Sequence, residues 1–228
     1  VAGFSILLKP NGVATFEFPH LLKLVNENQF DTIYHEHFSY LSLTALEAIF
    51  KENGLQIFDV EEHTTHGGSL RLFAQRSDTG VQIVSEQVIK LRKREMDAGM
   101  NSDNFYKNFQ EKANIVKDDL LNFLIKAKQD GKKVVAYGAA AKGNTLLNYA
   151  GIRPDLLSYV VDKSPSKQGK YMPGSRIPIH TEQFLKDDKP DYVLILPWNL
   201  KSEVIKQLSY IKENGGKFVV AVPQLEII

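Results

Sequence analysis

The 228-residue sequence carries 28 lysine and arginine residues against 27 aspartate and glutamate residues, which gives a formal net charge of +1. This balance, together with the lack of a basic cluster interleaved with aromatic residues, argues against a nucleic-acid partner. The sequence has no cysteine, which excludes disulfides and thiolate metal sites. No apolar run approaches the ~20 residues that a membrane helix needs. We therefore expect a soluble, cytoplasmic globular protein without a membrane partner.

The first 28 residues are expected to form the end of a helix, a strand and a second helix. Residues 1–8 are typical of the end of a helix, and Pro10 and Gly12 then stop that helix and start a strand at 13–18. A second helix is expected around 19–28. Because the sequence starts at Val1, inside what reads as a helix, we expect it to begin partway into a longer protein.

Residues 30–40, FDTIYHEHFSY, concentrate groups that can move protons. Tyr34, His35, Glu36 and His37 are consecutive in a sequence with only six histidines. If the segment is extended, Tyr34 and Glu36 share one face and the two histidines share the other. If it bends, three of the four side chains can converge on one small volume.

Three kinds of chemistry compete for this segment. A metal site needs a third ligand besides the two histidines, from Glu36, His63 or His66, and zincin spacing fails because Ser39 stands at the required fourth position. The histidines can instead make only structural hydrogen bonds to nearby backbone. Four such groups in a row favour the third interpretation, general acid and base catalysis by a histidine that titrates near neutrality.

The next elements are a helix and a hairpin. Leu43 to Asn53 is expected to be helical, with Ser42 or Thr44 as its N-cap and Gly54 at its end. Strands near 55–61 and 69–75 are expected to form an antiparallel hairpin at a sheet edge. The glycines of the intervening loop favour a positive φ.

Residues 81–130 are charged and predicted to form two helices with a break at 98–102. Val84, Val88 and Leu91 mark the apolar face of the first helix. The second apolar run is Phe105, Phe109, Ile115, Leu120 and Phe123. We interpret this region as a helical connector.

Residues 131–228 alternate apolar strands with helices, which predicts a parallel sheet covered on both faces and a Rossmann-like domain. The first turn, GAAAKGNT at 138–145, is not a Walker A loop, because Asn144 replaces its lysine. Nor is it a dinucleotide fingerprint, because Ala140 replaces the second glycine. A strand that leads into a helix N-terminus with a lysine nearby still favours an anion site, although small residues at such a turn can serve packing alone.

Other residues of this domain are placed for ligand binding. Asp162 follows the next strand, where acids that bind ribose are found, and Trp198 and Asn199 follow a later strand at the same sheet edge. Trp198 can stack on a ligand ring or cap the core. The long loop between the second strand and Ile179 carries Lys163, Lys167 and Arg176, which can frame an anion.

Four motifs occur in the chain in a fixed order: FEFPHLLKLVNENQFDTIYHEHFSYLSLTAL, THGGSLRLFAQ, YGAAAKGNTLLNYAGI and VVDKSPSKQGKYMPGSRIPI. With them the sequence resembles the sugar C-methyltransferases, which depend on S-adenosylmethionine and act on nucleotide-linked keto sugars. The resemblance covers nearly the whole chain. It implies an α/β fold: the C-terminal half of a Rossmann-type methyltransferase sheet in 1–80, the helical connector in 81–130 and the Rossmann-like domain in 131–228.

The resemblance also implies roles for individual residues. His37 is expected to be the general base, Tyr34 to stabilise an enolate and Glu36 to hold their geometry; the sequence alone does not separate His37 from His35. The expected contacts to a nucleotide-diphosphate sugar are His66, Ser69, Lys142, Asn144, Thr145, Asp162, Trp198 and Asn199.

The sequence departs from the resembled enzymes in two ways. It has neither their cysteine-rich zinc region nor their complete S-adenosylmethionine site. We therefore expect that cofactor to bind mainly to a region absent from this chain, zinc to occur only in a missing N-terminal region, and the chain to be inactive alone. A second copy of the chain can cover the exposed sheet edge as a homodimer. The alternatives are a non-catalytic sugar-nucleotide binding module and an NAD(P)-dependent oxidoreductase.

Overall fold

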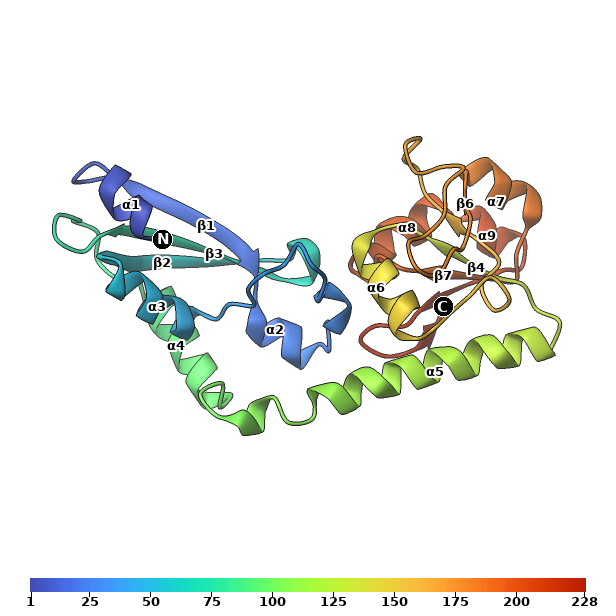
Figure 1. The fold of residues 1–228 in the computed structure, drawn as a ribbon, viewed down its shortest axis with the longest axis horizontal. Coiled ribbons are helices and arrows are strands. Elements are labelled where there is room, and N and C mark those ends of the chain that lie inside the picture. The colour runs from blue at the N-terminus through green and yellow to red at the C-terminus, as the bar shows by residue number, and fades with distance from the viewer. The chain divides into compact units, whose positions relative to one another are not determined.

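The computed structural model describes residues 1–228, which form two compact units (Figure 1). The N-terminal unit comprises residues 1–27 and 38–109, and the C-terminal unit comprises residues 28–37 and 110–228. The short segment 28–37 therefore packs with the C-terminal unit, although both of its neighbours in sequence belong to the other one. The predicted connector, 81–130, is divided between the two units.

The N-terminal unit is built on a three-stranded antiparallel sheet with the order β1-β3-β2. The predicted hairpin is present, with β3 as the central strand. The elements are α1 (Ala2–Leu7), β1 (Val13–Pro19), α2 (Leu21–Asn26), α3 (Leu43–Glu52), β2 (Leu55–His63), η2 (Thr65–Gly67), β3 (Ser69–Arg76), α4 (Glu86–Asp97) and η3 (Asp103–Phe105).

The core of this unit lies between the sheet and the helices α3 and α4. Leu46 and Phe50 of α3 and Leu91 of α4 pack on buried strand residues such as Leu70 and Leu72. Of the two predicted caps for α3, Ser42 fills the position, and its hydroxyl accepts a hydrogen bond from the Ala45 N–H at 3.1 Å.

The C-terminal unit contains a six-stranded sheet with the order β6-β5-β4-β7-β8-β9. All neighbouring strands are parallel except β8 and β9. The elements are η1 (Phe30–Thr32), α5 (Phe109–Gln129, within this unit from Gln110), β4 (Val134–Tyr137), α6 (Ala141–Tyr149), β5 (Val160–Val161), β6 (Ile179–His180), α7 (Glu182–Asp188), β7 (Tyr192–Ile195), η4 (Trp198–Leu200), α8 (Lys201–Gln207), α9 (Tyr210–Glu213), β8 (Lys217–Val220) and β9 (Glu226–Ile227). The predicted α/β class is confirmed.

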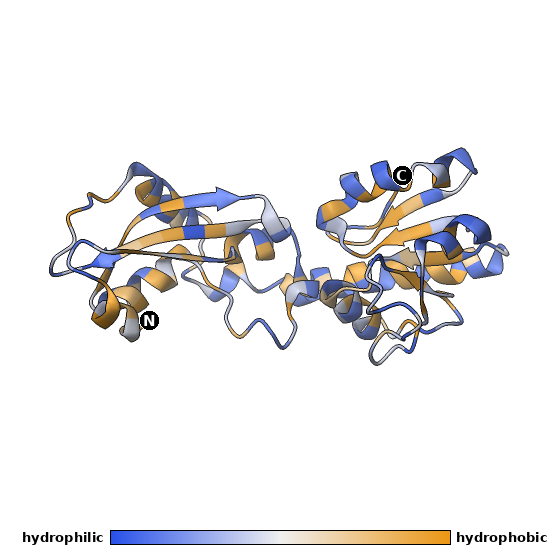
Figure 2. Ribbon diagram, turned by 90° about the horizontal axis from the view of Figure 1, so that it is seen from above, coloured by the Kyte–Doolittle hydropathy of each residue, from blue (hydrophilic) through white to orange (hydrophobic).

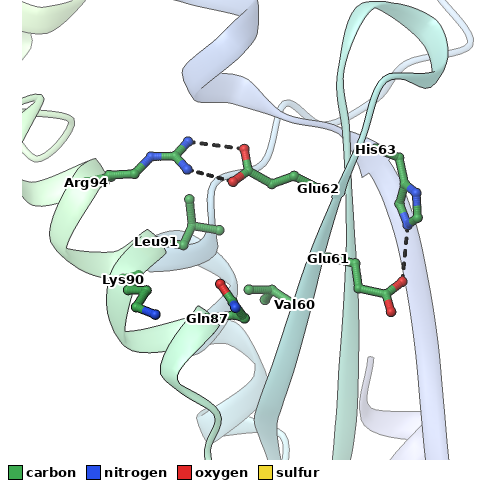
Figure 3. A pocket seen from close by; sticks show the side chains of 8 residues that line it. All are labelled: Val60, Glu61, Glu62, His63, Gln87, Lys90, Leu91 and Arg94. Carbon is green, nitrogen blue, oxygen red and sulfur yellow. Dashed lines mark hydrogen bonds and ion pairs between the residues drawn. The ribbon is translucent and has the colours of Figure 1, made fainter.

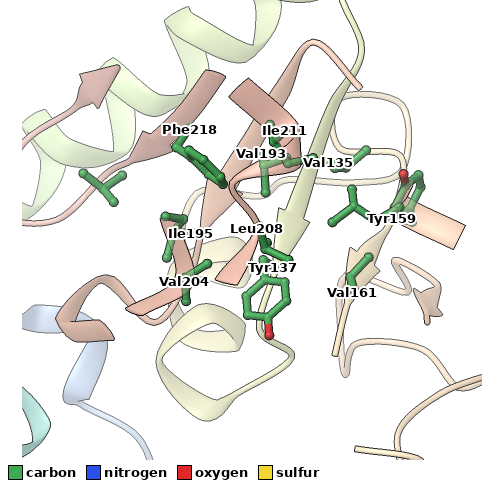
Figure 4. Packing of buried hydrophobic residues seen from close by; sticks show 12 residues of the cluster. Val135, Tyr137, Tyr159, Val161, Val193, Ile195, Val204, Leu208, Ile211 and Phe218 are labelled. Atoms are coloured by element: carbon green, nitrogen blue, oxygen red, sulfur yellow. The ribbon is translucent and has the colours of Figure 1, made fainter. Parts of the chain in front are cut away.

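The strands of this sheet are apolar because both of its faces are covered (Figure 2). On one face, alternate strand residues pack with buried residues of α8 and α9 (Figure 4). That cluster consists of Val135, Tyr137, Tyr159, Val161, Leu185, Val193, Ile195, Val204, Leu208, Ile211, Phe218 and Val220. The intervening strand residues, such as Ala136 and Leu194, are also fully buried.

The predicted apolar run was partly right for α5, since Leu120 is buried and Phe109 and Phe123 are half-buried. Ile115 is 53% exposed, and the buried residues are Ala113, Val116, Leu120, Leu124 and Ala127. Their spacing of three and four residues follows one stripe of an α-helix, in which small alanines serve as well as large side chains. Phe123 instead packs its ring edge-on against Tyr192, at 5.1 Å between centroids.

Candidate functional site

The Tyr34–His37 segment is a tight turn. The His37 N–H donates a hydrogen bond to the Tyr34 carbonyl at 2.9 Å, and the two rings lie 4.2 Å apart between centroids with 35° between their planes. The bent arrangement is therefore the one that the structure adopts, and the extended alternative is wrong. His35 and Glu36 form the exposed corners of the turn, whereas Tyr34 and His37 are half-buried.

The imidazole of His37 is oriented by the backbone. Its Nδ1 lies 2.8 Å from the carbonyl oxygen of Thr32. A carbonyl can only accept a hydrogen bond, so Nδ1 carries the proton and Nε2 of the neutral ring has the free lone pair. Sequence reasoning assigned the orienting role to Glu36 and did not single out Thr32.

The segment that leads into this turn is anchored in the C-terminal unit. The side chains of Phe30, Asp31 and Thr32 in η1 are all buried. The ring of Phe30 packs against Tyr149 of α6, at 5.4 Å between centroids. Asp31 accepts a hydrogen bond at Oδ2 from Nε1 of Trp198, at 2.7 Å. The turn is therefore held by residues more than a hundred positions away in sequence.

Two opposite charges, those of Asp31 and Lys142, influence each other at this anchor of the turn. Burial raises the pKa of Asp31 to about 6, against the opposing effects of the Trp198 hydrogen bond and the positive charge of Lys142. Burial lowers the pKa of Lys142, and the negative charge of Asp31 opposes that shift. The Lys142 ammonium lies 4.3 Å from the centre of the Trp198 ring and 3.3 Å from Oδ1 of Asn199.

The shifted pKa of Asp31 predicts a specific pH dependence of stability. Because its pKa is higher in the folded than in the unfolded chain, its contribution is fully present below the unfolded value near 4 and is lost as the pH rises through about 6. The rise of this pKa from 3.8 to about 6 corresponds to about 3 kcal/mol. We expect the difference in free energy of unfolding between wild type and Asp31→Asn to change by this amount between pH 4 and 8. Denaturant unfolding at both pH values measures it, and an unchanged difference would contradict the assignment.

Lys142, Trp198 and Asn199 lie where the strand order reverses. In the sheet, β5 and β6 lie on one side of β4, and β7 and β8 lie on its other side. Ligands of open α/β sheets bind beyond the carboxyl ends of the strands at such a switch point. Lys142 follows β4, and Trp198 and Asn199 follow β7. The fold therefore places these three predicted residues at the expected ligand-binding edge.

The small residues of the β4–α6 turn also serve packing. Gly138 has a φ of +96°, and a Cβ there would lie 2.5 Å from Cδ of Pro197. A Cβ on Gly143 would lie 2.7 Å from Cβ of Leu196. Both glycines let α6 approach the end of β7 closely.

A pocket of about 390 Å³ opens beside this turn. Asn144 contributes to its wall, whereas the hydroxyl of Thr145 donates to the Ala141 carbonyl within α6. Two cations, Lys167 and Lys170, belong to the lining. The complete lining is Ala139, Ala140, Ala141, Asn144, Ser166, Lys167, Lys170, Tyr171, Met172, Pro173 and Ile179.

Asp162 is engaged by the protein itself. Its Oδ2 accepts hydrogen bonds from the Ala139 N–H at 2.8 Å and from Lys167 at 3.1 Å, and its Oδ1 accepts one from the Ser164 N–H at 2.8 Å. The Asp162 carboxylate is thus already hydrogen-bonded to one backbone amide of the β4–α6 turn.

The remaining predicted contacts, His66 and Ser69, belong to the N-terminal unit. His66 is exposed in η2 with a φ of +56°. Ser69 is buried and donates to Oε1 of Glu17 at 2.7 Å. This hydrogen bond and that of Arg71 lower the pKa of Glu17 to about 2. His63 and His66, proposed as further metal ligands, lie in a different unit from His35 and His37.

A second pocket, of about 520 Å³, lies in the N-terminal unit between β2 and α4 (Figure 3). Within its lining, Arg94 pairs with Glu62 at 2.6 Å and His63 lies 3.2 Å from Glu61. No group of three or more histidine, aspartate or glutamate side chains in the chain is arranged to hold a metal ion. No helix has both the length and the apolar character required to span a bilayer.

Together, the fold and the site define an α/β protein with a Rossmann-like domain, in which Trp198 at the ligand-binding edge donates to Asp31 of the segment that leads into the His37 turn. The chain belongs to the C-methyltransferase family, since the model of the C-methyltransferase C-terminal domain matches residues 64–223. The chain is also 37% identical over 226 residues to the C-methyltransferase NovU of Streptomyces niveus. That alignment covers 99% of this chain and 54% of the relative, so the chain spans about half the length of this curated protein. The resemblance to sugar C-methyltransferases is thereby confirmed.

Proposed function

We propose that this chain forms the acceptor-binding and proton-abstracting part of a C-methyltransferase that depends on S-adenosylmethionine. The acceptor is the carbon next to the ketone of a nucleotide-linked keto sugar. The observation that carries the proposal is the turn in which the Thr32 carbonyl fixes the His37 tautomer beside the Tyr34 ring. Membership of the C-methyltransferase family supports it.

The residues of the turn have complementary roles. Nε2 of His37 accepts the acidic proton from the carbon next to the ketone, because Nδ1 is already protonated toward Thr32. The electron pair of the broken C–H bond moves into the ketone and forms an enolate. The hydroxyl of Tyr34 donates to the enolate oxygen as negative charge develops there.

The methyl donor, unlike the acceptor, carries a positive charge at its reacting group. S-adenosylmethionine supplies an electrophilic methyl group on a positively charged sulfur. The candidate site of the C-terminal unit carries Lys142 at the switch point and Lys167 and Lys170 in the adjoining pocket, which suits an anion and opposes a sulfonium. The residues at this site do not fit the donor, and we assign them to the acceptor alone.

The diphosphate of the acceptor has a matching environment. Asn144 and Lys170 line the pocket beside the N-terminus of α6, and Lys142 lies on the first turn of that helix. Lysine and helix N-terminal amides are common phosphate partners. We assign Lys142, Asn144 and Asn199 to the nucleotide-sugar contacts.

Calorimetry on the 228-residue chain tests this assignment. We expect a thymidine-diphosphate sugar to bind and S-adenosylmethionine not to bind. Lys142→Ala is expected to weaken sugar-nucleotide binding by about tenfold, the effect of losing one charged hydrogen bond. Lys128→Ala, on the exposed side of α5 where it pairs with Asp155, is the matched control and is expected to bind normally. Absence of nucleotide-sugar binding, or equal losses in both variants, would contradict the proposal.

A further inference from the structure

Asp31 is a buried acid that sequence reasoning did not select. It is fully buried in η1, and Trp198, which donates to its Oδ2 at 2.7 Å, lies 167 residues further along the chain. Its second oxygen, Oδ1, has no hydrogen-bond partner. Buried carboxylates are normally satisfied at both oxygens, so this one is held at a cost to stability.

A structural role alone does not require this charge. An asparagine at position 31 could accept the same indole hydrogen bond through its side-chain oxygen, without the cost of burying a charge. The negative charge of Asp31 does, however, influence the protonation of a second residue, Lys142. Lys142 is half-buried, and the electrostatic attraction of Asp31 favours its protonated form.

Trp198 contacts both groups. Its ring edge donates to Asp31, and the ammonium of Lys142 lies 4.3 Å from the centre of the same ring. A cation over an indole ring is attracted by the negative potential of the π face. The indole thus connects the segment that carries the His37 turn to the lysine that follows β4.

We propose that Asp31 and Trp198 form a positioning pair that fixes the His37 turn on the C-terminal sheet and keeps the Lys142 ammonium in place beside it. This inference rests on the proposed function, because it explains how the base and the anion-binding cation reach the same acceptor. Neither member of the pair needs to touch the acceptor. The Asp31 hydrogen bond positions the turn, and its charge supports Lys142.

Nitrogen NMR of the full 228-residue chain, labelled in the histidine rings and the lysine side chains, tests the two roles separately. Trp198→Phe removes the donor but retains an aromatic ring, and Asp31→Ala removes the acceptor. In both variants we expect the fraction of His37 with the proton on Nδ1 to fall by about twofold or more, since the contact with Thr32 loosens. Asp31→Asn keeps the hydrogen bond, and so is expected to preserve the His37 tautomer while lowering the pKa of Lys142.

Val193→Ala is the matched control, because it removes buried volume from the core cluster on which Trp198 also packs but leaves the side chains of Asp31, Trp198 and the turn unchanged. It is expected to lower stability without changing the tautomer of His37. The pair would be overturned if Trp198→Phe and Asp31→Ala both kept the wild-type tautomer, if Val193→Ala changed it equally, or if Asp31→Asn left the pKa of Lys142 unchanged. These signals require no sugar nucleotide. A failure of positioning is therefore distinguishable from a failure of the proposed substrate, which the calorimetry reports.

Discussion

Replacing His37 with glutamine is expected to reduce methyl transfer by about 10³-fold, a typical contribution of a positioned general base. Glutamine is similar in size and can donate to the Thr32 carbonyl, but it has no nitrogen that accepts a proton at neutral pH. The loss should appear in kcat, with a much smaller change in KM, because the side chain acts mainly in the transition state. The assay uses the full-length protein with S-adenosylmethionine and a thymidine-diphosphate keto sugar.

His35→Gln is the control that separates the two histidines of the turn. His35 is exposed at its corner, whereas His37 is half-buried against Tyr34. We expect His35→Gln to keep nearly the wild-type rate. If His35→Gln lost as much activity as His37→Gln, the assignment of the base to His37 would have no support.

Replacing Glu95 with alanine is expected to destabilise the N-terminal unit by about 3–5 kcal/mol, the typical cost of removing one member of a buried charged network. Glu95 lies on α4 and is fully buried. Its two oxygens accept hydrogen bonds from the N–H groups of Leu43 and Thr44, each at 2.8 Å, and from the Thr44 hydroxyl at 2.6 Å. The acid therefore satisfies the first amides of α3, which would otherwise be buried without partners.

The same network predicts acid sensitivity. Burial raises the pKa of Glu95, but hydrogen bonds from His20 and from Thr44 outweigh burial and leave the pKa below its usual value. Its stabilising contribution is thus present above the unfolded pKa and is lost as the pH falls through the folded value. Denaturant unfolding of Glu95→Ala checks the size of the effect. Glu86→Gln, which removes the exposed pair with Lys90 on the same helix, is the control and should cost much less.

Much of the fold follows from local patterns in the sequence. The apolar runs that form β4, β7 and β8 predict buried parallel strands, because such strands need apolar residues on both faces. The strands β6 and β9 have two residues each and are too short for any pattern to distinguish them from loop. Of the buried face of α5, Leu120 was predicted, whereas Ala113 and Ala127 were missed because alanine carries little hydropathy signal.

The candidate site was only partly accessible from sequence. The composition of Tyr34 to His37 predicts proton chemistry, but the bend of this segment depends on a hydrogen bond that composition does not reveal. The contact between Asp31 and Trp198 joins residues 167 positions apart, and no local pattern predicts such a pairing. The one available signal was an acid between the apolar residues Phe30 and Ile33, which is unusual for a buried segment.

Deuterium exchange at the acceptor carbon tests the central claim most directly. The full-length protein is incubated in D₂O with a thymidine-diphosphate 4-keto sugar and without a methyl donor, and the sugar is analysed by mass spectrometry and proton NMR. If His37 abstracts the proton next to the ketone, wild type will incorporate deuterium at that carbon, His35→Gln will do so at a similar rate, and His37→Gln will not. Exchange in His37→Gln at the wild-type rate, or no exchange in wild type while the sugar nucleotide is bound, would contradict the account.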